Sequence, residues 1–177
     1  GVSGRKRRKT WKGKDIGMKA INTMTLTFDS LEANESFARS ATAGFFTQLD
    51  PTVEELCDIR TAVSEAVTNA IVHGYRREKG KVKLTARIYP GRKISVTVRD
   101  SGCGIADIEK AMEPLYTTDP EGERSGLGFS VMQSFMDSVK VSSAPGKGTA
   151  VTMQRTLSPL PDDGGVIVDF SCRGAEI

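Results

Sequence analysis

The sequence predicts an α/β protein of the α+β kind, a two-layer sandwich in which helices cover one face of a mainly antiparallel, mixed sheet. Three observations lead to this class. Apolar and polar residues alternate in two pairs of neighbouring segments, 81–89 with 93–100 and 138–143 with 149–154. Two segments with helical spacing precede the first pair, and a shorter one lies between the pairs. This order, β-α-α-β-β-loop-α-β-β, is neither a repeating βαβ pattern nor all-β, and helices on one face of a sheet satisfy it best.

The first strand and the first helix are predicted by their periodicity. The segment "MTLTF" at 24–28 alternates as a strand does, and the segment 32–49 has apolar residues at helical spacing, namely Phe37, Ala41 and Phe45. A strand followed by a helix is therefore expected at the start of the domain.

The second helix has both a start signal and a stop signal. Thr52 and Glu55 have the spacing of a capping box, and Gly74 is a plausible C-terminal cap. The 3, 4 spacing of apolar residues predicts one buried face. This face consists of Ile59, Ala62, Val63, Ala66, Val67, Ala70 and Ile71.

Two turns and a short helix complete the predicted fold. "PGR" at 90–92 separates the first pair of alternating segments and "PGKG" at 145–148 separates the second, so each pair predicts a hairpin. The last helix is expected to begin near Gly128 and to continue through "FSVMQSFM".

The charge of the chain is concentrated at its two ends. Residues 1–17 hold seven Lys and Arg against one Asp, and residues 158–177 hold four acidic residues against one Arg, so within the total of +3 the body is neutral. We expect a basic disordered extension at 1–17, one domain at 18–157 and a loosely structured acidic tail at 158–177. A nucleic-acid-binding function would have to rest on the basic extension alone, and the neutral body argues against it.

Composition excludes several other classes. No run reaches the roughly 18 apolar residues that a membrane span requires, and no signal peptide is evident, so a cytoplasmic protein is expected. Three cysteines without a CxxC pair suggest neither a disulfide framework nor a zinc site.

A polar stripe on the second helix is the first functional candidate. Asp58, Glu65, Asn69 and His73 fall on a line separate from the buried face. Exposed helix faces usually carry Lys, Glu and Arg, and Asn is a poor helix former in the interior of a helix. The stripe alone leaves two interpretations open, an ordinary exposed face or a functional site.

Two further clusters favour a site. Asp100 ends an alternating strand and is followed by Gly102 and Gly104, which allow a tight turn and a close approach to a ligand. A carboxylate there accepts hydrogen bonds and suits an amine such as that of adenine. Gly126 and Gly128 lie at the entry to the last helix, where backbone N–H groups favour phosphate.

The sequence resembles the GHKL superfamily of ATPases and kinases through "EAVTN", "DSGCGI" and "GLGF". It is more closely similar to the anti-sigma F factors of sporulating bacteria through "NESFAR", "LDPT", "VSEAVTNAIVHGY", "PLYTTDP" and "ERSGLGF". The similarity covers Met18 to about Leu157, and it implies the Bergerat ATP-binding fold.

The resemblance implies a role for each polar cluster. Asn69 would coordinate Mg²⁺, Glu65 would act as the general base, Asp100 would accept a hydrogen bond from the adenine amine, and Gly104 would lie beside the base. The segment 105–125 would form a mobile lid.

The remaining implied site residues lie in or near that lid. Arg124 would bring positive charge to the γ-phosphate and is, with Glu65, an implied catalytic residue. The implied nucleotide-binding residues are Asn69, Asp100, Gly102, Gly104, Thr118, Gly126, Leu127 and Gly128.

The resemblance also implies partners. They are a sigma factor of the sigma F type, which the protein would inhibit, and an anti-anti-sigma protein of the STAS type, which it would phosphorylate on serine with ATP and Mg²⁺. A homodimer is implied, and Arg39 is a candidate partner contact, with a plain surface arginine as the alternative. The alternative function is a nucleotide-dependent binding module without significant kinase turnover.

Overall fold

The computed structural model describes residues 18–76, 78–113 and 128–160. Its strands form a five-stranded sheet in the order β1-β2-β3-β5-β4, and each of the four pairings between these described strands is antiparallel. The strands are β1 (Asn22–Asp29), β2 (Lys81–Tyr89), β3 (Lys93–Arg99), β4 (Ser138–Ser143) and β5 (Thr149–Thr156). The predicted sandwich and both predicted hairpins are confirmed, and no described pairing supplies the parallel part of a mixed sheet.

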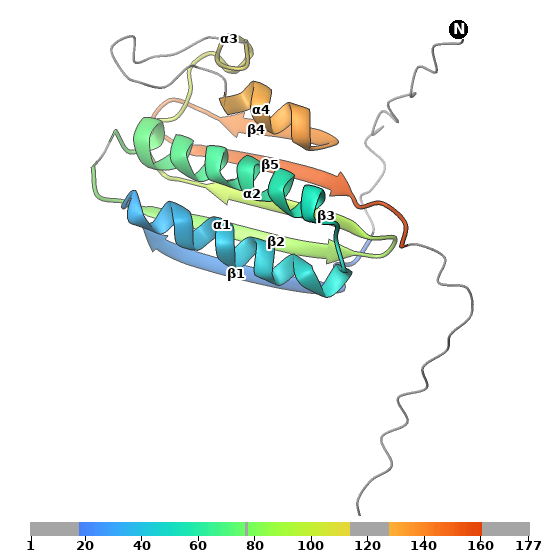
Figure 1. Cartoon of the computed structure of the whole chain (residues 1–177). Helices are drawn as coiled ribbons and strands as arrows, with labels where there is room; N and C mark the ends of the chain where they lie inside the picture. Colours follow the sequence, from blue (N-terminus) through green and yellow to red (C-terminus); the bar gives the residue numbers. More distant parts are fainter. Residues whose placement is uncertain (1–17, 77, 114–127, 161–177) are drawn as a thin grey trace, which may run out of the picture.

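The long helices lie on one face of this sheet, as Figure 1 shows. They are α1 (Ala33–Phe46), α2 (Val53–Thr68) and α4 (Gly128–Phe135), which begins where the sequence predicts. A 3-10 turn, η1 (Thr47–Leu49), follows α1; a π-helical turn, η2 (Asn69–Gly74), follows α2; and the short α3 (Ile108–Ala111) comes after β3.

The predicted buried face of α2 is confirmed in full. Its apolar residues, from Ile59 to Ile71, are at most 4% exposed and pack on the inner side chains of β2 and β3. Complete burial of an Ile or Val side chain contributes about 1.5–3 kcal/mol. The core therefore fixes the rotation of α2, and with it the direction in which the polar stripe points.

The apolar spacing in α1 predicted the helix but not its buried face. Phe37 is 56% exposed, whereas Ala38, Thr42 and Phe46 are buried. Positions four residues apart share one face of a helix, and the row that begins at Ala38 is one position beyond the row of Phe37. Thr42 satisfies its hydroxyl by donating to the Ala38 carbonyl at 2.8 Å, so a threonine can occupy the core.

The start of α2 is fastened to the chain that follows β5. Thr52 and Glu55 form the predicted capping box, and Glu55 Oε1 also accepts from Ser158 N at 2.7 Å. Burial alone would raise the pKa of the Glu55 carboxyl, but hydrogen bonds from Ser158 and Thr52, together with the positive charge of Arg155, leave that pKa below its ordinary 4.5. This bond is made by the first residue of the segment predicted to be loose, 158–177.

A second connection reinforces this end of the sheet. Arg92 has a φ of 57° in the β2–β3 turn, and its guanidinium donates to the carbonyl oxygens of Leu49 at 2.5 Å and Ser158 at 2.6 Å. The extensions at 1–17 and 161–177 lie outside the described residues. Among the helices that the structure does describe, none is both long and apolar enough to cross a membrane.

Candidate functional site

The end of α2 and the start of α4 bring the first two candidate groups together. Glu65 lies in the last turn of α2 and Asn69 begins η2, and both are half-buried. A Cβ atom on Gly128 would lie 3.0 Å from Glu65 Oε2 and 3.3 Å from Asn69 Nδ2. The first residue of α4 therefore lies against two of the four side chains of the stripe, Glu65 and Asn69.

The stripe does not act as one unit. Asp58, two turns before Glu65, forms an ion pair with Arg155 at 2.8 Å, so it belongs to a structural contact at the other end of α2. Glu65 and Asn69 are the stripe residues that face Gly128 at the start of α4.

The helix changes its winding at Asn69, which the sequence did not predict. From Asn69 to Gly74 the chain forms a π-helical turn, and Tyr75 N donates to Ala70 O at 3.1 Å, five residues back. Single π turns frequently occur at functional sites because the extra residue turns side chains away from their α-helical directions. Here the π turn ends against the loop that follows β3.

Asp100 is the buried acceptor that the sequence predicts at the end of β3. It is 5% exposed, and its Oδ1 accepts from Gly102 N at 2.9 Å. Burial raises the pKa of the Asp100 carboxyl, although the backbone N–H groups of Gly102 and Thr149 oppose this rise. Holding a carboxylate in this position is therefore costly, as is often found at functional sites.

Close backbone contact holds Asp100 in place. A Cβ atom on Gly74 would lie 2.8 Å from Asp100 Cγ, and a Cβ atom on Gly102 would lie only 2.0 Å from the Gly74 carbonyl oxygen. The same carbonyl oxygen accepts from Cys103 N at 2.8 Å. The loop of Gly102 can approach the end of η2 this closely only because neither glycine has a side chain.

The other side of this loop rests on the β4–β5 turn. Gly104 has a φ of 71°, and a Cβ atom there would lie 2.0 Å from Ala144 O. Ile105 N donates to Ser143 Oγ at 2.8 Å, and Gly146 N donates to Cys103 O at 2.7 Å. The segment 100–105 is thus held by hydrogen bonds between η2 and the β4–β5 turn.

Tyr75 is a site-supporting residue that the sequence analysis missed. Its hydroxyl accepts from Ser101 N at 2.9 Å and donates to Lys81 O at 2.5 Å, so it joins the residue after Asp100 to the start of β2. The tyrosine directly follows the predicted helix stop at Gly74. A tyrosine after a helix stop indicates only that the chain turns there. No periodic pattern in the sequence identifies its hydrogen-bond partner Ser101, which lies 26 residues away.

Several predicted residues cannot be placed at this site. Thr118, Arg124, Gly126 and Leu127 lie outside the described residues. The described start of the predicted lid contains α3, which Asp107 caps by accepting from Lys110 N at 3.0 Å. Arg39 lies on α1, where its Nη2 donates to Ser36 Oγ at 3.1 Å and its Nε is 3.4 Å from Glu35 Oε1.

The arrangement suits a nucleotide better than a metal bound by protein ligands alone. Among the described residues, no group of three or more His, Cys, Asp or Glu side chains could hold a metal ion. Mg²⁺, however, commonly takes one or two protein oxygens and completes its shell with phosphate and water. Asn69 and Glu65 beside the start of α4, with Asp100 as a buried acceptor, fit an Mg²⁺–nucleotide in this way.

The comparison with known proteins agrees with this geometry. The family model of the histidine kinase-like ATPase domain matches residues 28–155. The anti-sigma F factor of Thermoanaerobacter sp. (strain X514) is 56% identical over 140 residues, which cover 79% of this chain and 97% of the relative. Those of Oceanobacillus iheyensis and Clostridium acetobutylicum are 54% and 52% identical over 137 and 141 residues, covering 77% and 80% of this chain and 94% and 98% of the relatives.

The matched range contains every described site residue, from Glu65 to Gly128. The resemblance inferred from the sequence motifs is confirmed, and an ATPase domain of this type implies nucleotide binding. The chain belongs to the histidine kinase-like (GHKL) ATPase family, in the group of the anti-sigma F factors.

Proposed function

We propose that the protein is an anti-sigma factor that captures a sporulation sigma factor of the sigma F type and is also an ATP-dependent protein serine kinase. Its phosphorylation substrate is an anti-anti-sigma factor of the STAS type. The observation that carries the kinase proposal is the contact of Glu65 and Asn69 with the first residue of α4. The names of the relatives support the sigma-factor partner.

Nucleotide binding uses the two ends of the site. Asp100 accepts a hydrogen bond from the adenine amine, and Gly102 and Gly104 let the backbone approach the base. The start of α4 at Gly128 supplies backbone N–H groups to phosphate oxygens. Asn69 would hold Mg²⁺ through its amide oxygen, and the ion when bound would neutralise charge on the phosphates.

The residues outside the described ranges complete this proposal. Arg124 brings a positive charge to the γ-phosphate. Thr118, Gly126 and Leu127 add nucleotide contacts from the segment that precedes α4. Arg39 on α1 contacts a partner protein, the working unit is a homodimer, and we place the protein in the cytoplasm with its sigma factor.

The chemical step assigns one proton transfer to this chain. The Glu65 carboxylate takes the proton of the substrate serine hydroxyl while the serine oxygen forms a bond to the γ-phosphorus and the bond to the β–γ bridging oxygen breaks. Phosphoserine and ADP are formed, and Glu65 then releases its proton to water. Simple nucleotide binding needs no base next to the metal-binding amide, which favours a kinase over a binding module.

A transfer assay tests the proposal. The full chain is incubated with γ-labelled ATP, Mg²⁺ and a purified STAS-type anti-anti-sigma protein, and the labelled residue is mapped by mass spectrometry. Label on one serine of the partner is expected. Sigma capture that depends on ATP, without any label on the partner, would establish the binding module instead of the kinase.

A further inference from the structure

A contact at the far end of α4 has no role in the site as described so far. Helix α4 packs against α2, and the two helices are also connected at each end of α4. At its N-terminal end, Gly128 lies against Glu65 and Asn69. At its C-terminal end, a side chain from β5 connects α4 to α2.

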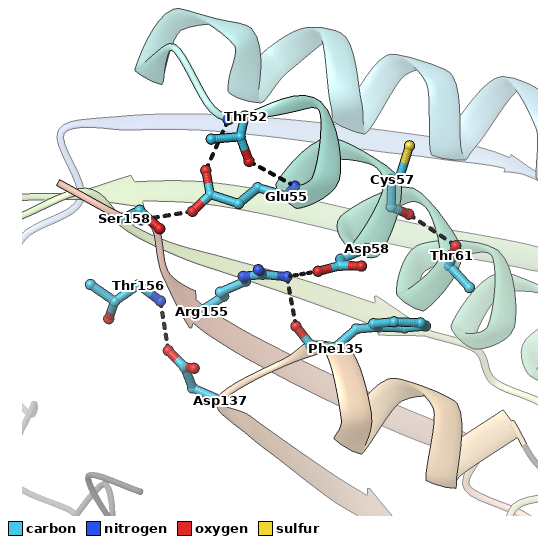
Figure 2. A network of polar contacts seen from close by, with 10 residues as sticks. All are labelled: Thr52, Glu55, Cys57, Asp58, Thr61, Phe135, Asp137, Arg155, Thr156 and Ser158. Carbon is cyan, nitrogen blue, oxygen red and sulfur yellow. Dashed lines mark hydrogen bonds and ion pairs between the residues drawn. The ribbon is translucent and has the colours of Figure 1, made fainter. Parts of the chain in front are cut away.

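That side chain is Arg155, which Figure 2 shows between the two helices. Its Nη1 donates to the Phe135 carbonyl oxygen at 2.8 Å and to Asp58 Oδ2 at 2.8 Å. The side chains of Arg155 and Asp58 are only 17% and 19% exposed, so solvent screens this ion pair less than it screens a surface pair. Glu55 adds a second negative charge nearby, since Arg155 lowers its pKa.

The two helical stretches between these contacts have matching lengths. Helix α4 runs from Gly128 to Phe135, and the facing part of α2 runs from Glu65 back to Asp58, so each stretch has eight residues. At a rise of 1.5 Å per residue each spans about 10–12 Å. The helices are therefore antiparallel and are joined at both ends of the same interval.

The chemistry of the C-terminal contact is also favourable. The last carbonyl groups of a helix have no partner within the helix, and a cation there interacts well with the helix dipole. Arg155 satisfies one such carbonyl, that of the last residue of α4. Loss of this contact would release the end of α4 that lies farthest from the site.

We propose that Arg155 is a positioning residue for phosphoryl transfer. By holding the C-terminal end of α4 to Asp58, it prevents α4 from sliding along α2 and so fixes the start of α4 relative to Glu65 and Asn69. This inference rests on the proposed kinase function. In that function, the fixed position of the start of α4 relative to Glu65 aligns the phosphates with the base. Misplacement of reacting groups by about 1 Å can cost a hundredfold in rate.

The test compares three variants of the full chain. Arg155→Met keeps the unbranched aliphatic part of the side chain and removes both hydrogen bonds. Arg155→Lys retains a cation and tests rescue, because both contacts come from a single nitrogen. Asp137→Ala is the matched control: Asp137 accepts from Thr156 N at 2.7 Å, so this variant loosens the same corner without touching the Phe135 carbonyl or Asp58.

Three quantities are measured for each variant. They are the transfer rate constant and KM for ATP in the labelled assay, the dissociation constant of adenosine by calorimetry, and hydrogen exchange of the α4 amides without nucleotide. For Arg155→Met we expect the rate constant to fall about 10- to 100-fold and exchange in α4 to accelerate. Adenosine affinity should stay within about twofold, since the Asp100 end is not altered, and Arg155→Lys should recover part of the rate.

The outcomes separate the two proposals. A parental protein that binds ATP but labels no partner residue would refute the kinase function, and the role of Arg155 with it. With an active parental protein, an unchanged rate constant in Arg155→Met would refute the positioning role alone. An equal loss of rate in Asp137→Ala would also overturn it, because the effect would then come from general loosening of this corner. Circular dichroism verifies that each variant is folded.

Discussion

Replacing Asp100 by Asn separates the stability of the fold from its function. The substitution keeps the size and shape of the side chain, and the Asn oxygen can still accept from Gly102 N, as Asp100 Oδ1 does at 2.9 Å. It replaces the other carboxylate oxygen by an NH₂ group. A donor then faces the adenine amine, which is also a donor.

The loss of affinity follows from the burial of Asp100. A side chain that is 5% exposed exchanges little of its hydrogen bonding with water. A hydrogen bond to a charged group contributes about 1.5–3 kcal/mol, so ATP and ADP should bind about 10- to 150-fold more weakly. The free energy of unfolding should increase or stay unchanged, because the variant no longer has to bury an ionised carboxylate.

The dependence on pH distinguishes this explanation from a general loss of structure. Since burial raises the pKa of Asp100 in the folded protein, the folded state binds the proton more tightly than the unfolded state. The parental protein therefore loses stability as the pH rises from below 3.8, the ordinary value, through the raised pKa. The variant lacks this loss, so its Tm relative to the parental protein should increase from acid to neutral pH.

Calorimetry with ATP and ADP measures the affinity, and thermal unfolding across pH measures the stability. Asp29→Asn is the control, since Asp29 is an exposed carboxylate that pairs with Lys81 at the edge of the sheet. It should leave both quantities unchanged. If Asp100→Asn bound ATP at the parental affinity, Asp100 would not be the adenine acceptor; if its Tm at neutral pH fell by many degrees, the carboxylate would be structural.

Four further variants test the supports of the site and the core. Tyr75→Phe should reduce the unfolding free energy by about 1–2 kcal/mol and weaken ATP binding, because the residue after Asp100 loses its anchor; unchanged ATP affinity in calorimetry would contradict this. Gly102→Ala places a Cβ atom 2.0 Å from a backbone oxygen and should destabilise, whereas Gly44→Ala, with open space around it in α1, should stabilise by about 0.5–1 kcal/mol. Equal stabilities of these two variants in urea would refute the close packing. Because the pKa of Glu55 is lowered, its stabilising effect is present above pH 4.5 and is lost as the pH falls through the folded value. In Glu55→Gln, Tm should therefore fall less steeply toward acid pH than in the parental protein. An equally steep fall of Tm in both proteins would show that Glu55 does not contribute to the loss of stability in acid.

Local patterns in the sequence predicted much of the fold. The capping box at Thr52, the buried face of α2 and the two hairpins depend on neighbouring residues, so their spacing was sufficient. The face of α1 was not predictable in the same way. Three phenylalanines fall on two rows of that helix, and only packing against the sheet decided that Phe46 is buried and Phe37 is exposed.

Contacts between distant parts of the chain could not be predicted from periodicity. Arg155 is 97 positions from Asp58, and Tyr75 is 26 positions from Ser101, so no local window contains both partners. The candidate site could be proposed from the sequence because its residues fall in three short motifs. Its winding at Asn69 was missed, because the apolar spacing of an α-helix continues unchanged through the π turn.

The general base at Glu65 is the central claim, and a single-turnover comparison tests it most directly. Parental protein and Glu65→Gln are each saturated with labelled ATP and Mg²⁺, and transfer to the STAS-type partner is followed in the same samples in which nucleotide affinity is measured. Gln keeps the shape of the side chain beside Gly128 and removes the basic carboxylate. The transfer rate should fall by about 10²- to 10⁴-fold, while ATP affinity stays within about threefold. Transfer by Glu65→Gln at the parental rate would contradict the account, because the base would then have to lie elsewhere.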